Sequence, residues 1–300
     1  MATAMQVSID HTAGFCKGVE HSVSVAEEEL KSGQPLYCLG EIIHNRQVVN
    51  SLCEKGLRII DHSDFSQLKG VRVLIRAHGE PPETYRIAKE NSITLIDTTC
   101  HIVRTLQQRI REDHAESAPQ GTQVVIAGRK DHPEVIGLRG QIPGKVFIIS
   151  SEEELEAVDF RKPVRIYAQT TFNIARFESI KVRADEISRS IPEEERGPLL
   201  IRNSICGQVR RRENALVEFS RKHHVVVFIS DPSSSNGKFL FGICRANNPS
   251  SHFITGPGDL QPHWFADTPS VGVTGATSTP LWLLQKVAGK ITEIVSSQQD

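Results

Sequence analysis

The stretch SITLIDTTCHIVRTLQQRIRED, residues 92–113, contains the pattern that decides the fold class. Its first five residues are almost continuously apolar and include β-branched side chains, which is typical of a buried strand. After Cys100 the apolar residues recur at helical spacing, which predicts an amphipathic helix. Cys100 is therefore expected where a strand ends and a helix begins. Whether it is a buried apolar residue, a nucleophile or a metal ligand stays open at this point.

The same alternation of strand and helix patterns continues along nearly the whole chain. Buried strands are predicted at 71–75, 92–96, 123–128, 145–150, 164–168, 224–230 and 270–275. Amphipathic helices are predicted at 19–32, 44–55, 82–91, 102–115, 173–190, 208–222 and 279–295. This alternation favours an α/β fold with mainly parallel sheets, with too many strands for one small domain. The loops predicted at 117–121 and 192–198 are candidate seams between domains.

Composition and charge exclude several classes of function. The chain has 300 residues, 35 of them basic and 36 acidic, so its net charge of −1 does not attract nucleic acid or an anionic membrane. The N-terminus lacks the pattern of a secretory signal, and no apolar run reaches the ~18 residues that a membrane helix needs. We therefore expect a cytoplasmic protein with no nucleic-acid or membrane partner. The short basic cluster 210–212 is expected to be a solvated helix face.

Six cysteines in a reducing compartment favour metal binding, catalysis or burial over disulfides. Cys16, Cys100 and Cys206 each follow a strand-like segment and begin a helical pattern. Ligands of open α/β sheets bind at the carboxyl ends of strands, so three such thiols can lie around one point. The remaining cysteines, Cys38, Cys53 and Cys244, are expected to be buried apolar residues.

Other polar residues follow predicted strands in the same way. His44, His78 and His132 lie in strand-to-helix turns, where a surface or capping role is the alternative to ligand binding. Small polar loops occupy 169–171, 233–238 and 274–280, and helix N-termini of this kind bind phosphate or are simply capped. Glu134 is expected in the first turn of a helix, either as a stabilising carboxylate or as a general acid near a bound anion. No P-loop or Rossmann fingerprint is present.

In their order along the chain, these segments resemble the family of 4-hydroxy-3-methylbut-2-enyl diphosphate reductases, which complete the non-mevalonate isoprenoid pathway. The matching blocks are AGFCKGV, EIIHNR, RAHGE, IDTTC, DHPEV, AQTTF, NSICGQV, SSSNGK and GVTGATSTPLWLL, from residue 13 to about 285. The resemblance implies a trefoil of three α/β units, with mainly parallel sheets, around a central cluster and substrate pocket. The implied units are 17–100, 101–198, and 199–300 together with 1–16.

The resemblance also implies a cofactor and a reaction. Cys16, Cys100 and Cys206 are expected to hold a [4Fe–4S] cluster whose fourth iron is open to an allylic diphosphate substrate. The family removes the substrate hydroxyl with two electrons and two protons and forms isopentenyl and dimethylallyl diphosphate. Because the sequence has no flavin or nicotinamide motif, the electrons are expected from an external donor, ferredoxin or flavodoxin.

Further site residues follow from the resemblance. The expected diphosphate ligands are His44, His78, His132, Ser234, Ser235, Asn236 and Ser278, as protonated imidazoles and neutral donors. Glu134 is expected to supply a proton, and Thr170 to orient the substrate hydroxyl with it. The chain departs from the family pattern at His101, at Asp131 and in the basic cluster 210–212.

Two alternative functions stay open from the residues alone. A zinc hydrolase of a phosphorylated substrate would use His44, His78 and His132 as ligands and Glu134 as base, although their spacing lacks the i, i+4 pair of an H-E-x-x-H helix. A non-catalytic iron–sulfur or anion-binding protein is the third reading.

Overall fold

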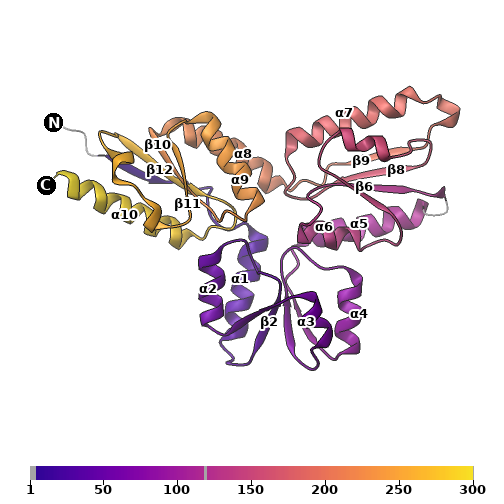
Figure 1. Ribbon diagram of the computed structural model, residues 1–300, viewed down its shortest axis with the longest axis horizontal. Coiled ribbons are helices and arrows are strands. Elements are labelled where there is room, and N and C mark those ends of the chain that lie inside the picture. Colours follow the sequence, from indigo (N-terminus) through magenta and orange to yellow (C-terminus); the bar gives the residue numbers. More distant parts are fainter. Residues whose placement is uncertain (1–4, 118–119, 300) are drawn as a thin grey trace. The chain divides into compact units, whose positions relative to one another are not determined.

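The computed structural model describes residues 5–117 and 120–299, and it contains three four-stranded sheets (Figure 1). Sheet A has the order β1 (Gln6–Ile9), β12 (Ser270–Gly275), β10 (Val225–Ile229), β11 (Ser251–Ile254). Sheet B has the order β3 (Leu57–Ile60), β2 (Leu36–Leu39), β4 (Arg72–Ile75), β5 (Thr94–Asp97). Sheet C has the order β7 (Val146–Ile149), β6 (Gln123–Ala127), β8 (Val164–Ala168), β9 (Leu199–Arg202).

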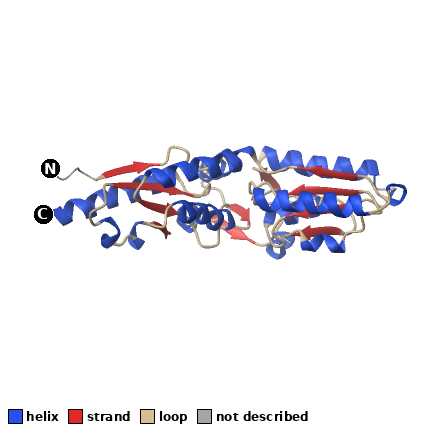
Figure 2. Cartoon of the chain, turned by 90° about the horizontal axis from the view of Figure 1, so that it is seen from above, coloured by secondary structure: helices blue, strands red, loops and turns tan. Residues whose placement is uncertain are grey.

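Helices alternate with strands along the chain, and Figure 2 shows helices lying beside the strands. The helices are α1 (Lys17–Leu30), α2 (Arg46–Glu54), α3 (His62–Gln67), α4 (Pro82–Glu90), α5 (His101–Ser117), α6 (Pro133–Arg139), α7 (Ile174–Ser190), α8 (Gly207–Lys222), α9 (Ser235–Asn247) and α10 (Leu281–Gln299). Short 3₁₀ turns occur at Glu153–Ala157, Glu193–Glu195, Pro257–Asp259 and Pro262–Phe265. Strand pairs in all three sheets run parallel, which confirms the predicted α/β class. Within the described residues, no helix is both long enough and apolar enough to span a membrane.

The chain divides into two compact units. Unit 1 comprises 1–33, 41–57 and 208–300, and unit 2 comprises 34–40 and 58–207. Unit 1 contains sheet A, and unit 2 contains sheet C and nearly all of sheet B. Strand β9 pairs with β8, so the segment 192–198 connects two elements of sheet C. A charged, proline-bounded segment marks a surface loop, and such loops occur inside a domain as well as between domains.

Each sheet is buried by its own apolar residues. All five residues of β10 are buried, as expected for a parallel strand covered on both faces. One side of sheet A packs against the inner face of α10 through Leu283, Leu284, Val287 and Ile291. In sheet C the core combines residues of the strands, of α5 and α6, and of the segment after α6: Leu106, Ile110, Val124, Ile126, Val135, Leu138, Ile142 and Tyr167. These cores fix the strand ends from which the site residues project.

Two expectations about individual residues are wrong. Arg212 is not part of a solvated face, because its side chain is 5% exposed and pairs with Asp10, which is 2% exposed. Its neighbours Arg210 and Arg211 are exposed as expected. Cys53 is exposed, because it lies on the outer side of α2, whose other residues supply the buried side chains. The burial of Cys38 and Cys244 is confirmed.

Candidate active site

The three cysteines at predicted strand-to-helix junctions all directly precede a helix. Cys16 occupies the N-cap position of α1, Cys100 precedes α5 and Cys206 precedes α8. All three are partly exposed, whereas Cys38 and Cys244 are buried, and none of the cysteines, all of which lie in the described residues, forms a disulfide. Cys16 belongs to unit 1, and Cys100 and Cys206 belong to unit 2. Their partial exposure leaves these three thiols accessible to a ligand, unlike the two buried cysteines.

Short polar turns shape the two cysteine loops of unit 2. The Asp97 carboxylate accepts hydrogen bonds from the backbone N–H and the hydroxyl of Thr99, at 2.9 and 2.5 Å. The Asn203 side chain accepts a hydrogen bond from the backbone N–H of Ile205 at 3.2 Å. Each turn begins three residues before a cysteine. Such Asx turns end a strand and start a tight loop.

A buried carboxyl lies beside these loops in unit 2. Glu134, in the first turn of α6, is 1% exposed. Its carboxyl accepts hydrogen bonds from the backbone N–H of Thr170 at 2.6 Å and from the Thr170 hydroxyl at 2.8 Å. Burial raises the pKa of Glu134 to about 7, although the hydrogen bonds from Thr170 lower it. A large fraction of this carboxyl is therefore protonated at neutral pH, as a proton donor requires.

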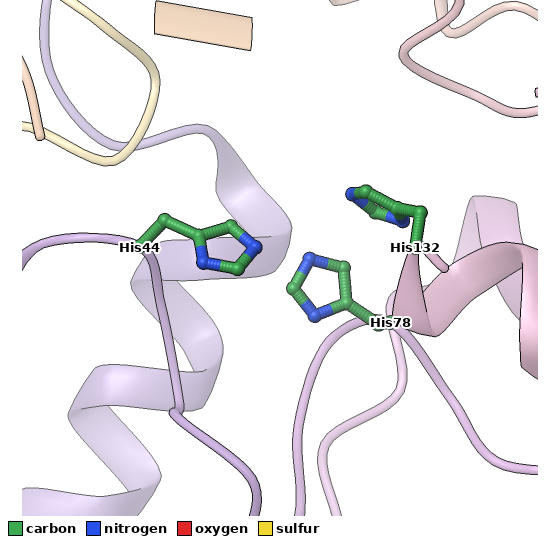
Figure 3. A group of neighbouring side chains, drawn as sticks. All are labelled: His44, His78 and His132. Carbon is green, nitrogen blue, oxygen red and sulfur yellow. The ribbon is translucent and has the colours of Figure 1, made fainter. Parts of the chain in front are cut away.

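Two of the predicted site histidines, His78 and His132, belong to unit 2. His132 caps α6, because its Nδ1 accepts the backbone N–H of Glu134 at 3.2 Å. The rings of His132 and His78 meet edge to face, with centroids 5.2 Å apart (Figure 3). Because Nδ1 accepts this hydrogen bond, Nε2 is the ring nitrogen of His132 that can donate to a ligand.

The remaining predicted residues come together in unit 1. The Ser278 hydroxyl donates to the backbone carbonyl of His44 at 3.3 Å. The Asn236 amide donates to the Thr277 hydroxyl at 2.9 Å, and the Thr277 carbonyl accepts the backbone N–H of Cys16 at 3.2 Å. The segments of unit 1 that follow β1 and β12 and the first turn of α9 are thus joined around Thr277.

Ser234 and Ser235 lie at the start of α9. Ser234 is the N-cap, and its oxygen accepts the backbone N–H of Gly237 at 3.0 Å. The capping interpretation is therefore correct for Ser234, but the cap uses only a lone pair, so the hydroxyl hydrogen can still be donated. Ser235 is the first residue of the helix, where backbone N–H groups have no partner within the helix.

The comparisons with known proteins cover nearly the whole chain. The family model described as LytB protein matches residues 7–292. The chain belongs to the LytB protein family. Its relatives include the 4-hydroxy-3-methylbut-2-enyl diphosphate reductase of Bacteroides fragilis, which is 42% identical over 295 residues, 98% of this chain and 100% of the relative. The enzyme of the same name from Porphyromonas gingivalis is 43% identical over 291 residues, 96% of this chain and 99% of the relative.

Solved structures of LytB relatives have the same fold. One, described as (E)-4-hydroxy-3-methyl-but-2-enyl diphosphate reductase, the terminal enzyme of the non-mevalonate pathway, aligns with a TM-score of 0.71 and 32% identity. That alignment covers 96% of this chain and 99% of the other. A reductase from Plasmodium falciparum aligns with a TM-score of 0.80 and 25% identity, covering 95% and 87%. The resemblance found in the sequence is therefore confirmed.

Sequence reasoning missed several residues that shape this LytB site. Asp97 and Asn203 start the cysteine turns, and Thr98 and Ser204 follow them directly. The shared pattern [DN]-[ST]-x-C, which occurs at 97–100 and again at 203–206, is a signal that could have identified them. Arg212 had no comparable signal, because its partners are distant in the sequence.

Proposed function

We propose that this LytB protein is a 4-hydroxy-3-methylbut-2-enyl diphosphate reductase. The reaction removes the hydroxyl of the allylic diphosphate with two electrons and two protons, and it yields isopentenyl and dimethylallyl diphosphate. The observation that carries the proposal is the full-length similarity to reductases of this name. The buried acid Glu134 gives it chemical support, because loss of hydroxide as water needs a proton donor.

Cys16, Cys100 and Cys206 would hold a [4Fe–4S] cluster. The donor set fits this cofactor, because thiolates are the usual ligands of iron–sulfur clusters and all three cysteines are accessible at helix starts. The other cysteines fit less well, since two are buried and Cys53 lies within a helix. When bound, a cluster with three protein ligands supplies electrons and a Lewis-acidic iron to the substrate oxygen.

Glu134 donates the proton, and Thr170 orients it. The acid is neutral over part of the pH range around 7, so it can donate a proton to the departing hydroxyl. Thr170 holds both carboxyl oxygens of Glu134 and orients the acid, and its hydroxyl lies beside the acid where it can also orient the substrate hydroxyl. Both groups are buried, which limits competing protonation by water.

The diphosphate is bound by neutral donors and histidines. The proposed ligands are His44, His78, His132, Ser234, Ser235, Asn236 and Ser278. His132 donates from Nε2, because its Nδ1 is the helix cap. The start of α9 adds backbone N–H groups, which favour a phosphate oxygen.

The electron donor is a separate protein, ferredoxin or flavodoxin, and the reducing cytoplasm suits the three thiols. The zinc hydrolase reading is not favoured, because the relatives named above are reductases.

The test is anaerobic turnover of the diphosphate substrate with an artificial reductant. The proposal expects a brown protein with about four iron and four sulfide per chain. It also expects isopentenyl and dimethylallyl diphosphate as products. A colourless zinc protein that releases inorganic phosphate or diphosphate would replace the proposal by the hydrolase. A cluster-containing protein without reductive turnover would leave only a binding or sensing role.

A further inference from the structure

Two of the three cysteine loops repeat one arrangement of hydrogen bonds. The Thr98 hydroxyl donates to the carbonyl of Ile75, the last residue of β4, at 2.6 Å. The Ser204 hydroxyl donates to the carbonyl of Ala168, the last residue of β8, also at 2.6 Å. In each case the hydroxyl lies two residues before the cysteine, and the accepting strand neighbours the strand that leads to that cysteine.

The backbone N–H of each of these two cysteines donates a second hydrogen bond. The backbone N–H of Cys100 donates to the carbonyl of Ala77 at 3.0 Å, and that of Cys206 donates to the carbonyl of Thr170 at 2.8 Å. Both acceptors lie two residues beyond the end of the neighbouring strand. The pairing between strands is thereby extended past the strand ends up to the cysteine itself. Each cysteine is also tied to a loop with a proposed substrate group, His78 after Ala77 and Thr170 itself.

Unit 1 contains the same arrangement with one substitution. The backbone N–H of Cys16 donates to Thr277, which lies two residues beyond Gly275, the last residue of β12. Among the described residues, no hydroxyl donates to the Gly275 carbonyl at the end of β12. The guanidinium of Arg212 donates to the carbonyl of Gly275 at 2.9 Å and also binds Asp10, at the start of the loop to Cys16. A buried arginine therefore occupies the position that a hydroxyl has in unit 2.

The hydrogen bond from the Thr98 hydroxyl is not needed to satisfy the Ile75 carbonyl at the end of β4. The Ile75 carbonyl already accepts the backbone N–H of Thr98 at 2.9 Å. The extra bond from the Thr98 hydroxyl therefore restricts the loop and adds a second partner to an acceptor that is already satisfied. Ser204 restricts its loop further, because its oxygen also accepts the backbone N–H of Ala168 at 2.8 Å.

We propose that Thr98, Ser204 and Arg212 are positioning residues, one for each cysteine. They hold the three cysteine backbones in the arrangement that lets three thiolates bind one cluster, and they do not contact substrate. This inference rests on the proposed function, since it assumes that the three cysteines are the cluster ligands.

The test uses substitutions at Thr98 that separate hydrogen bonding from shape. Thr98→Val keeps the shape and removes the hydroxyl, and Thr98→Ser keeps the hydroxyl. Ser204→Ala removes the second hydroxyl. The matched control is Ser251→Ala, which removes the bond from a buried hydroxyl to the Asn248 carbonyl, at 2.7 Å, at the edge strand β11 of sheet A. The measurements are the rate of iron loss to a chelator under anaerobic conditions, the electron paramagnetic resonance spectrum of the reduced protein, and the melting temperature.

We expect Thr98→Val and Ser204→Ala to lose iron roughly 5-fold faster than wild type, the factor that one hydrogen bond supplies. Their spectra should broaden, while Thr98→Ser stays close to wild type. Ser251→Ala should lower the melting temperature by a similar amount and leave iron loss and spectrum unchanged. Equal iron loss in Thr98→Val and Thr98→Ser would overturn the positioning role, as would equally fast loss in Ser251→Ala. A wild-type protein that takes up no iron would overturn the proposed function itself.

Discussion

At the scale of single residues, burial determines the pKa of Glu134 and so its ability to donate a proton. Its replacement by glutamine keeps the size of the side chain and removes the proton. Because general-acid catalysis contributes ~10²–10⁴-fold, turnover of Glu134→Gln should fall by that factor while its iron content stays at the wild-type level. Wild-type turnover should also fall as the pH rises through about 7, because the acid must be protonated. Steady-state kinetics and iron analysis check both results, and normal turnover would assign the proton to another group.

The same residue makes stability depend on pH. Folding raises the pKa of Glu134 from 4.5 to about 7, so the protonated form is favoured in the folded protein. The stability associated with the neutral acid is full below pH 4.5 and is lost as the pH rises to about 7, by about 3 kcal/mol. Glu134→Gln should therefore gain stability relative to wild type over this range. Urea unfolding of the apoproteins at several pH values measures the difference, and parallel curves would contradict it.

The buried ion pair of Arg212 and Asp10 shows the opposite shift, because the pKa of its carboxyl is lowered. Burial alone would raise the pKa of Asp10, but Arg212 and the hydrogen bonds from Thr12 outweigh it, so the pKa lies below the ordinary value. Arg212→Met leaves the carboxylate buried and unpaired, which should cost ~3–5 kcal/mol of unfolding free energy at pH 7.5. The wild-type protein loses the stability that the ion pair contributes as the pH falls through the lowered pKa of Asp10. The variant instead becomes more stable when Asp10 is protonated, because the unpaired charge is then removed. The difference in unfolding free energy between wild type and Arg212→Met should therefore shrink at acid pH. When both proteins also carry Asp10→Asn, the effect of Arg212→Met should not depend on pH.

At the scale of elements, a strand end followed by a polar turn and a helix start is the repeated unit of the site. The sequence predicted these junctions, because apolar runs and helical periodicity locate elements by local pattern alone. It also predicted the group at each junction, such as Cys100 before α5. It did not predict the partners of those groups, such as Ile75 for Thr98, because a hydroxyl that binds a neighbouring strand has the same local sequence as one that faces solvent. The short helix α3 was missed for a related reason, since six residues contain less than two helical periods.

The start of α5 allows a direct test at the element scale. His101 is exposed at the first helical position, where proline fits because no N–H is needed. His101→Pro should therefore keep full iron content and a melting temperature close to that of wild type. The matched control is Arg104→Pro, since the backbone N–H of Arg104 donates to the Cys100 carbonyl at 2.9 Å and starts the helix. That variant should be destabilised by about 3 kcal/mol or more and should lose iron. Lost iron in His101→Pro would instead indicate that the histidine supports the cluster.

At the scale of the whole molecule, contacts between distant segments were beyond the reach of sequence patterns. Arg212 and Asp10 are 202 residues apart, and a run of three arginines gave no sign that one of them is buried. The pairing of β9 with β8 was hidden in the same way, because a proline-bounded, charged loop precedes β9. Pattern reasoning locates surfaces and elements, whereas the order of strands depends on packing that the whole chain completes.

The three proposed cluster ligands lead to a prediction for the stability of the whole molecule. Cys16, Cys100 and Cys206 lie far apart in the sequence, so a cluster bound by all three would connect distant segments of the chain. A ligand that binds only the folded state stabilises it by mass action. Removal of iron by an anaerobic chelator should therefore lower the melting temperature measured by calorimetry. Cys16→Ser should melt like the iron-free protein before any chelator is added, while Cys53→Ser, at an exposed helix position, should melt like the loaded wild type. Identical melting of the loaded and iron-free wild type would show that the cluster does not stabilise the fold.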